Sequence, residues 1–343
     1  EYDLWVASNH ARSLEPAHAG NVPRDVREEG VAEHAPGETA FARNGLEYVA
    51  RTVGADGAPH DHRLGWIAGR ARIRMYVAEM EDGRRQVLPS MRSELTDTWF
   101  DYTHLLFSPS DTLAAPVVKP GDDAFWTGQG RSWGSKCAHC HSSGAEPRTV
   151  DQDGGPRATV RDLGVDCEAC HGPGRAHAEA WRRMETDAPL PKLQELEREL
   201  SIASCTRCHM EGERLKAAWD PQEDFYEFLD PTLLLDPDRV DARGRPLELI
   251  YHGLSFGISR CANEGGLTCV RCHDAQGGEL PALLSREPTN DHLCSTCHVE
   301  LVRDVAGHSH HDALGSGASC VGCHMPRLVI ERGHGIITDH SIS

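Results

Sequence analysis

The sequence is short of the residues that normally fill a protein interior. Only 39% of its 343 residues are hydrophobic and 6% are aromatic, a low share for a 37.7 kDa chain that is long enough for two domains. The deficit indicates that something other than side chains occupies part of the core. Long apolar runs are absent too, since no stretch approaches the roughly 18–20 residues of a membrane helix. No signal-peptide pattern opens the chain, so we expect a mature, soluble segment.

Positive charge is also scarce. The chain has 35 Lys and Arg against 53 Asp and Glu, which gives a formal net charge of −18. Phosphate backbones and anionic membrane surfaces attract basic faces, so this charge argues against both as partners. A cationic or neutral partner is favoured instead.

Cysteine, in contrast, is abundant and regularly placed. Twelve of the 13 cysteines form six C-x-x-C pairs, and a histidine directly follows each pair. The pairs are Cys137/Cys140, Cys167/Cys170, Cys205/Cys208, Cys269/Cys272, Cys294/Cys297 and Cys320/Cys323, and the histidines are His141, His171, His209, His273, His298 and His324. Cys261 lies outside these motifs. We expect it to be a small buried residue, with a further ligand or an intermolecular disulfide as the alternatives.

The C-x-x-C-H pattern is typical of covalent haem c attachment. The two thiols bond to the vinyl groups at the haem edge, and the adjacent histidine reaches the iron from one face. Zinc ribbons need two pairs per metal and no histidine at that position, and disulfides of exported proteins are spaced less regularly. The six motifs therefore predict six covalent haems, which also supply the missing core. Thioether attachment takes place outside the cytoplasm, so we predict a periplasmic or extracellular protein.

The residue on the other face of each iron separates an electron carrier from an enzyme, because an open position invites a substrate. With 21 histidines against 6 methionines, we expect two histidines on each iron. Among the spare histidines, His177 follows a Gly-Pro-Gly turn and would serve a neighbouring haem. His308, His310 and His311 precede the last motif, and at least one of them is a candidate ligand. His252 is a further candidate.

The motifs are confined to the C-terminal part of the chain. Residues 1–136 contain none, whereas all six lie within residues 137–343. We therefore predict an N-terminal region of residues 1–136 that also carries a distal-ligand segment, followed by a hexahaem cytochrome region of residues 137–343.

The N-terminal region carries β signals. Strand-like runs flank Asn44-Gly45 and Asp82-Gly83, and both dipeptides are good hairpin turns. They predict a small antiparallel unit. Trp99, Trp126 and Trp133 precede the first motif, and we expect them to pack on the first haem or its neighbours.

The C-terminal region favours short helices and loops. Leu193, Leu196 and Leu200 recur at helical spacing and predict a helix that runs into the third motif. For the whole chain we predict a mostly irregular and α-helical multihaem fold, with short helices around stacked haems and a small N-terminal antiparallel β region.

Several segments, in their order along the chain, resemble a known family. LWVASNHAR, FWTGQGRSWGSKCAHCHSSG, CEACHGPGRAH, the stretch from HSHH to CHMP, and DHSIS are similar to the multihaem cytochromes c that are often followed by tetratricopeptide repeats. That group is related to the tetrahaem cytochrome c of ammonia oxidisers. The resemblance spans essentially the whole chain. It implies that His10, His177, one of His310 and His311, and His340 are distal ligands.

The chain departs from that family at both ends. In the family, another C-x-x-C-H directly precedes the segment matching EYDLW, and the segment matching DHSIS continues into proline-rich sequence. The resemblance thus implies that residues 1–343 are part of a longer product, and that one of the distal ligands serves a haem beyond them.

These observations predict a hexahaem cytochrome that transfers electrons along closely spaced haems, most of them bound by two histidines. The pattern favours an electron carrier over a catalyst without deciding between them. One alternative is an oxidoreductase with one open haem that acts on a small nitrogen or sulfur compound, although no C-x-x-C-K marks a lysine-bound iron. Another is a subunit of an extracellular conductive filament, in which His10 or His340 binds a haem across the interface. The expected partners are other redox proteins or identical subunits.

Overall fold

The computed structural model describes residues 2–34, 37–102, 118–148, 157–159, 162–185, 190–216, 219, 223–233, 240–247, 251–276, 284–285, 293–330 and 335–342. The chain folds into two compact units. The β unit comprises Asn9–Ala169 and Glu331–Gly335, and the helix unit comprises Glu1–Ser8, Cys170–Ile330 and Ile336–Ser343. None of the helices that the structure describes has both the length and the hydrophobicity of a bilayer-spanning segment.

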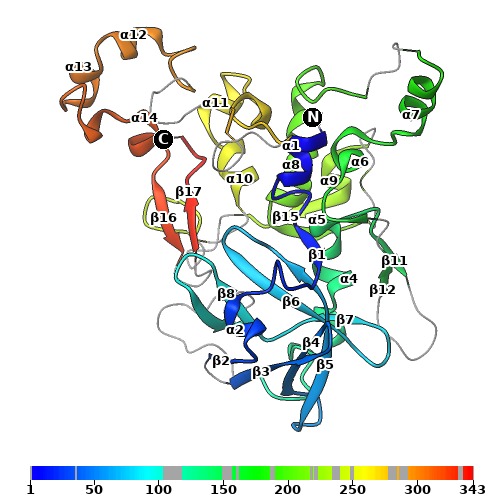
Figure 1. Cartoon of the computed structure of the whole chain (residues 1–343). Helices are drawn as coiled ribbons and strands as arrows, with labels where there is room; N and C mark the ends of the chain where they lie inside the picture. Colours follow the sequence, from blue (N-terminus) through cyan, green and yellow to red (C-terminus); the bar gives the residue numbers. More distant parts are fainter. Residues whose placement is uncertain are drawn as a thin grey trace. The chain divides into compact units, whose positions relative to one another are not determined.

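One antiparallel sheet of nine strands forms most of the β unit (Figure 1). The strands run in the order β2-β3-β4-β5-β6-β8-β9, with β1 paired to β5 and β7 paired to β6. β2 also lies close to β9, so the sheet is nearly closed. The strands are β1 Leu14–Pro16, β2 Val31–His34, β3 Gly37–Asn44, β4 Glu47–Val53, β5 Pro59–Ala68, β6 Ile73–Glu79, β7 Arg85–Val87, β8 Ser90–Ser93 and β9 Thr98–Asp101.

Both hairpins expected from the sequence are confirmed. β3 and β4 pair from Asn44 and Glu47 outward, and Gly45 in the turn has a φ of 63°. β6 and β7 are joined by a turn in which Gly83 has a φ of 78° and donates its amide hydrogen to the Met80 carbonyl at 2.8 Å. Glycine adopts this left-handed conformation without steric cost, which explains why it stands at both turns.

The sheet is covered on both faces by its own side chains. Tyr76 of β6 belongs to one hydrophobic cluster and the next residue, Val77, to the other, as expected for alternating faces of a strand. In β5 the register shifts between Leu64 and Trp66, which lie in different clusters despite their even spacing. The extra residue, Gly65, forms a bulge that turns Trp66 to the second face.

The second cluster carries the first motif. It contains Trp133 and Ala138, with Cys137 packed against it, and these residues belong to α4 (Trp133–Lys136) and α5 (Ala138–His141) or lie between them. The sheet is therefore the support on which the first C-x-x-C-H turn is built. Two short strand pairs complete the unit, namely β10 Ser142–Ser143 with β13 Asp162–Leu163 and β11 Glu146–Arg148 with β12 Arg157–Thr159.

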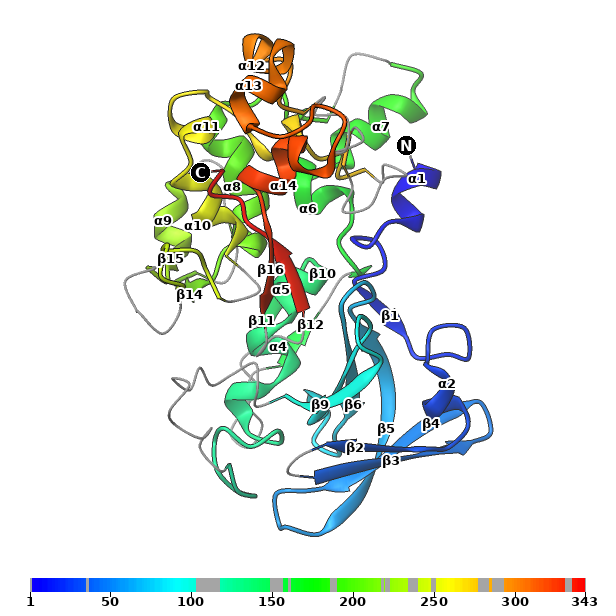
Figure 2. The same ribbon diagram turned by 90° about the vertical axis from the view of Figure 1, so that its left-hand side faces the viewer.

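The helix unit consists mainly of short helices (Figures 1 and 2). They are α1 Tyr2–Ala7, α7 Arg175–Arg182, α8 Arg198–His209, α9 Phe225–Phe228, α10 His252–Gly257, α11 Arg260–Asn263, α12 Val299–Arg303, α13 Val305–Ser309 and α14 Cys320–His324, while α6 Cys167–His171 spans the boundary between the units. Two strand pairs accompany them, β14 Gly212–Arg214 with β15 Leu229–Pro231 and β16 Arg327–Ile330 with β17 Gly335–Thr338. Over the described residues, both large hydrophobic clusters lie in the β unit. The described part of the helix unit thus lacks a comparable side-chain core.

The predicted fold class was wrong. The β region is not a small appendix, because the nine-stranded sheet occupies most of the chain from Leu14 to Asp101 and four further strand pairs follow it. Most of the helices span one or two turns. The predicted helix into the third motif exists as α8, but it begins at Arg198, so that Leu193 is buried in the turn before it.

Candidate haem centres

The motifs lie in short helices or turns, except for the third, which ends the longer helix α8. α5, α6 and α14 each end at the motif histidine, and α8 ends at His209. In the first, fourth and fifth motifs, the amide of the histidine donates to the carbonyl of the first cysteine at 3.1, 3.0 and 3.0 Å. Such a turn brings positions i, i+3 and i+4 to one side. Both thiols and the imidazole therefore face the same way, as two thioether bonds and one axial ligand require, and all thirteen cysteines are free of disulfides.

The motif cysteines look equivalent in the sequence but differ in the structure. Cys140 lies in a tight turn closed within its own motif, since its amide donates to the Cys137 carbonyl at 3.2 Å. Cys208 instead lies within the longer helix α8, and the Cys323 amide donates to the carbonyl of Ser319, the residue before its motif, at 3.2 Å. Cys140 and Cys208 are half-buried, whereas Cys323 is exposed. The shared spacing therefore did not indicate how far the chain itself shields each thiol.

Exposure divides the twelve motif cysteines into two groups. The exposed ones are Cys167, Cys297 and Cys323, and the half-buried ones are Cys137, Cys140, Cys170, Cys205, Cys208, Cys269, Cys272, Cys294 and Cys320. An exposed thiol is open to a haem edge without rearrangement of the chain. All twelve stay predicted attachment sites. Cys261, expected to be buried, is only half-buried.

The first motif is enclosed by the sheet. Trp133 is 2% exposed, and its ring centroid lies 5.6 Å from that of His141. The Ser13 hydroxyl donates to the His141 carbonyl at 3.1 Å. Burial raises the pKa of Cys137 to about 12 and lowers the pKa of His141. A neutral thiol and a neutral imidazole are therefore the stable forms in this pocket before attachment.

Backbone carbonyls select the tautomer of three histidines. Nδ1 lies 3.3 Å from the Ser13 carbonyl in His141, 2.6 Å from the Pro191 carbonyl in His171 and 2.8 Å from the Thr338 carbonyl in His340. A carbonyl only accepts, so Nδ1 carries the proton and Nε2 keeps its lone pair. Metal-binding histidines typically make this second contact. Among the contacts described for the chain, two motif histidines and the spare histidine His340 make it.

Four histidine rings of the helix unit form a series. His209 of the third motif lies 6.2 Å from His252, with ring planes at 87°. His252 lies 5.0 Å from His340 at 78°, and His340 lies 6.2 Å from His273 of the fourth motif at 24°. The structure thus brings two motif histidines and two predicted ligands together from distant parts of the chain.

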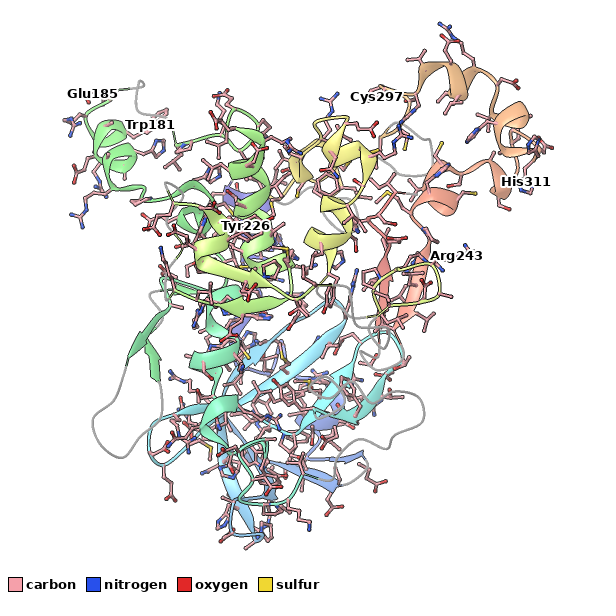
Figure 3. All side chains as sticks on the ribbon, turned by 180° about the vertical axis from the view of Figure 1, so that it is seen from behind. Trp181, Glu185, Tyr226, Arg243, Cys297 and His311 are labelled. Atoms are coloured by element: carbon pink, nitrogen blue, oxygen red, sulfur yellow. The ribbon has the colours of Figure 1, made fainter. Side chains whose placement is uncertain are left out.

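A second grouping involves the last motif. The ring of His308, near the end of α13, lies 6.0 Å from His324 of α14, with the planes 15° apart. His310 follows α13 with a φ of 59°, a left-handed conformation that reverses the chain. The labelled side chain of His311 lies just beyond α13, and that of Cys297 lies beside α12 (Figure 3). Of the three clustered histidines, His308 has its ring beside that of a motif histidine, with nearly parallel planes.

The spacing of these pairs suits two axial ligands of one iron. A metal–imidazole bond is about 2 Å long and the ring centre lies roughly 1 Å beyond the bonding nitrogen, so two axial rings have centroids about 6 Å apart. The pairs His209–His252, His273–His340 and His308–His324, at 6.2, 6.2 and 6.0 Å, fit this separation. The crossed contact of 5.0 Å between His252 and His340 is shorter and fits two ligands of different irons.

The third and fourth motifs also meet at their thiols. Cys205 and Cys269 are hydrogen-bonded through their side chains, which raises the pKa of Cys205 and lowers the pKa of Cys269. α10 packs tightly on α8, because a Cβ added at Gly253 would lie 2.6 Å from Cγ2 of Thr206. This close approach positions the neighbouring residue, His252, opposite His209.

Buried donors without acceptors surround the first motif. Arg131 is 7% exposed, and among the described residues its Nε and Nη2 have no hydrogen-bond acceptor, nor has Nε1 of Trp133. The Arg131 guanidinium stacks 3.9 Å from the centre of the Tyr102 ring, and Nη1 donates to the Ala124 carbonyl at 2.6 Å. Burial lowers the pKa of Arg131. A carboxylate of a haem propionate would satisfy these donors, so the residues fit the group.

Of the three tryptophans expected to pack on the first haem or its neighbours, Trp133 lies beside the first motif, whereas the described contacts of the other two lie elsewhere. The indole of Trp126 donates to the Val53 carbonyl at 2.6 Å, and that of Trp99 donates to the Asp25 carboxylate at 2.8 Å. Both contacts lie within the sheet region and its first hydrophobic cluster. Aromatic content near a motif therefore did not identify which ring faces it.

Some features of the site had no signal in the sequence. Arg131 and Tyr102 were not predicted to lie at the first motif. The carbonyls that select the histidine tautomers are backbone groups, which every residue has, so no residue type marks them in the sequence. The carbonyl of His10 accepts the Val165 amide at 2.9 Å, and the ring of His177 on α7 lies 6.2 Å from that of Trp181. Both histidines stay predicted ligands.

Comparisons with known proteins agree with haem c attachment. The family described as "Cytochrome c554 and c-prime" matches residues 127–172, and the family described as "Doubled CXXCH motif" matches residues 262–303. No curated protein matches the sequence.

Two solved structures are similar. "Crystal Structure of Outer Cell Wall Cytochrome OcwA" matches with a TM-score of 0.55 and 12% identity over 99% of this chain and 76% of that one. "Undecaheme cytochrome from S-layer of Carboxydothermus ferrireducens" matches with a TM-score of 0.39 and 15% identity over 80% of this chain and 45% of that one. The first likeness establishes a shared fold, and the second is too weak to carry an argument.

Proposed function

We propose that this chain, a multihaem c-type cytochrome, moves electrons along six closely spaced haems, most of them bound by two histidines. The observation that carries the proposal is the set of three histidine pairs at 6.0 to 6.2 Å, each joining a motif histidine to a spare one. When bound, haem supplies an iron that accepts and releases one electron. An iron with both axial positions filled has no place for a substrate, so the pairs favour electron transfer over catalysis.

The chain's residues take three roles in this proposal. The six cysteine pairs would form thioethers, and each adjacent histidine would be the first ligand of its iron. His252, His340 and His308 would be the second ligands for the third, fourth and sixth motifs. His10, His177, His310 and His311 are candidates for the other irons.

Arginine supplies the remaining contacts. Arg131 and the indole of Trp133 would hold a propionate at the first motif, where their buried N–H groups lack acceptors among the described residues. The chain contains 31 Arg and only 4 Lys. Guanidinium binds carboxylate in a bidentate manner that an ammonium group does not reproduce, which suits a protein with many propionates.

We place the protein in the periplasm or outside the cell. Thioether attachment occurs there, and the similar OcwA structure is described as an outer cell wall cytochrome. The net charge of −18 favours a basic redox protein as the electron partner. Identical subunits in a filament are the alternative partner. A haem that is six-coordinate when concentrated and five-coordinate on dilution would support that alternative.

Protein-film voltammetry of the full chain tests the function. We expect reversible oxidation and reduction whose integrated charge corresponds to six electrons per chain, with no catalytic current on addition of nitrite, hydroxylamine or sulfite. Intact-mass measurement provides the matching count of haems. A sustained catalytic current with one of these compounds would replace the electron carrier by the oxidoreductase alternative.

A further inference from the structure

The ligand rings assigned to the third and fourth motifs touch each other. His252 lies 5.0 Å from His340, and each is 6.2 Å from its own motif histidine, His209 or His273. The inference rests on the proposed function, in which these rings bind iron. Given that assignment, the four rings form a continuous series from one motif to the next.

The attachment sides of the same motifs are also in contact. The side chains of Cys205 and Cys269 are hydrogen-bonded to each other in the thiol form. One of these sulfurs belongs to each motif. The two motifs therefore lie next to each other at their attachment atoms, and their spare ligands His252 and His340 are in ring contact.

The two histidine pairs differ in the angle between their rings. An imidazole donates π electrons to the iron d orbital that lies perpendicular to the ring plane. Rings at 87°, as in His209 and His252, donate to two different d orbitals, whereas rings at 24°, as in His273 and His340, donate mainly to one. Donation to one orbital raises its energy and stabilises the ferric state, in which that orbital is half filled. Crossed rings lack this stabilisation and favour the ferrous state.

We propose that the crossed rings of His209 and His252 and the near-parallel rings of His273 and His340 would give the third haem a higher reduction potential than the fourth, with the contact between His252 and His340 coupling the two sites.

The fold holds both ring orientations. His340 donates from Nδ1 to the Thr338 carbonyl at 2.8 Å. The backbone at His252 is held by its neighbours, since Tyr251 is 1% exposed and a Cβ at Gly253 would lie 2.6 Å from Cγ2 of Thr206 and 3.1 Å from Cβ of Met210. The hydrogen bond of His340 and the packing of the backbone beside His252 therefore favour the observed ring positions.

Electron paramagnetic resonance during a redox titration of the full chain tests the proposal. Crossed ligands give a highly anisotropic low-spin signal, and near-parallel ligands give a rhombic one. We expect one highly anisotropic signal from the third haem and rhombic signals from the fourth and sixth, whose rings lie at 24° and 15°. On reduction, the anisotropic signal should disappear at a higher potential than the rhombic signal of the fourth haem. The reverse order would overturn the proposal.

Ligand variants assign the signals. His252→Ala should remove the anisotropic signal and produce one high-spin haem, and added imidazole should return that haem to low spin. His340→Ala should remove a rhombic signal and shift the potential of the third haem. The matched control is His308→Ala, which also removes a rhombic signal but lies outside the four-ring series and should leave the third potential unchanged. Equal effects of the two variants, or survival of the anisotropic signal in His252→Ala, would overturn the proposal.

A variant that keeps every ligand separates an effect of ring angle from the loss of a ligand. Gly253→Ala introduces a methyl group against Thr206 and should tilt His252, so that the anisotropic signal moves towards a rhombic one. An unchanged signal would contradict the argument from ring angle.

Failure of the proposed function would give a different result. A high-spin third haem in the unmodified protein would show that His252 is not its ligand.

Discussion

Individual residues fix the chemistry available at each centre. A backbone carbonyl accepts the Nδ1 proton of His141, His171 and His340, and this leaves Nε2 as the metal-binding nitrogen. At the first motif, burial has a second consequence. It leaves Nε and Nη2 of Arg131 without acceptors among the described residues, although the charge of Asp101 acts on the guanidinium, and a propionate of the attached haem would accept from them.

Replacement of Arg131 tests that pairing. Arg131→Met should leave a buried propionate without its cation and reduce the free energy of unfolding of the haem-loaded protein by about 1–3 kcal/mol. It should also lower the reduction potential of one haem, because a positive charge favours the ferrous state. Arg51→Met is the matched control, since Arg51 forms an exposed ion pair with Asp61 and such pairs contribute about 0–1 kcal/mol. Identical stabilities and potentials for the two variants would refute the pairing.

His62 gives the β unit a dependence on pH. Burial, and next the charge of His60, lower the pKa of His62 below its ordinary value of 6.5, and its ring packs edge-on against Trp126 at 5.0 Å. The unfolded chain then binds a proton that the folded chain resists, so the free energy of unfolding should fall as the pH drops below 6.5. Denaturant unfolding followed by circular dichroism at several pH values measures this fall. His62→Gln should be less sensitive to pH, and an equal slope in both proteins would disprove the role of His62.

At the scale of secondary-structure elements, short capped helices position the ligands. α13 carries His308, and its N-cap residue Asp304 accepts the Gly307 amide at 3.0 Å. The last motif is built in the same way, since Ser319 accepts the Gly322 amide at 3.0 Å at the start of α14. A helix of five residues has little stability of its own, so the cap contributes to the placement of the ligand.

Removal of the α13 cap should loosen His308. Asp304→Ala should cost about 1 kcal/mol, lower the thermal midpoint, and increase the high-spin absorption of one haem on mild heating. Asp304→Asn keeps an accepting side chain and should behave like the unmodified protein. If both variants lose the ligand to the same extent, charge rather than capping is responsible.

The elements were only partly predictable from the sequence. The hairpins at Gly45 and Gly83 were visible because glycine marks their turns. β1, β7, β8 and β9 span three or four residues each, too few for a periodic pattern, and β1 pairs with the distant β5. The C-x-x-C-H motifs could be recognised in the sequence, but the sequence did not indicate which spare histidine lies beside which motif. His340 meets His273 because tertiary folding brings the C-terminal segment back to the fourth motif, and no local pattern records that approach.

At the scale of the whole molecule, the low hydrophobic content is unevenly distributed. Both large hydrophobic clusters of the described residues belong to the β unit, which can therefore fold around its own side chains. The helix unit carries four complete motifs, short helices and the ligand pairs without a comparable cluster among its described residues. Covalent haems would supply the apolar surface that it lacks. The stability of this unit should therefore depend on haem attachment far more than that of the sheet.

The central claim is that spare histidines close the irons and make the protein an electron carrier. Electron paramagnetic resonance of the fully oxidised chain, with spins counted against total haem, tests it most directly. The account predicts that the haems of the third, fourth and sixth motifs are low-spin and that no high-spin signal reaches one spin per chain. A high-spin signal of one or more spins per chain would reveal an open iron and contradict the claim.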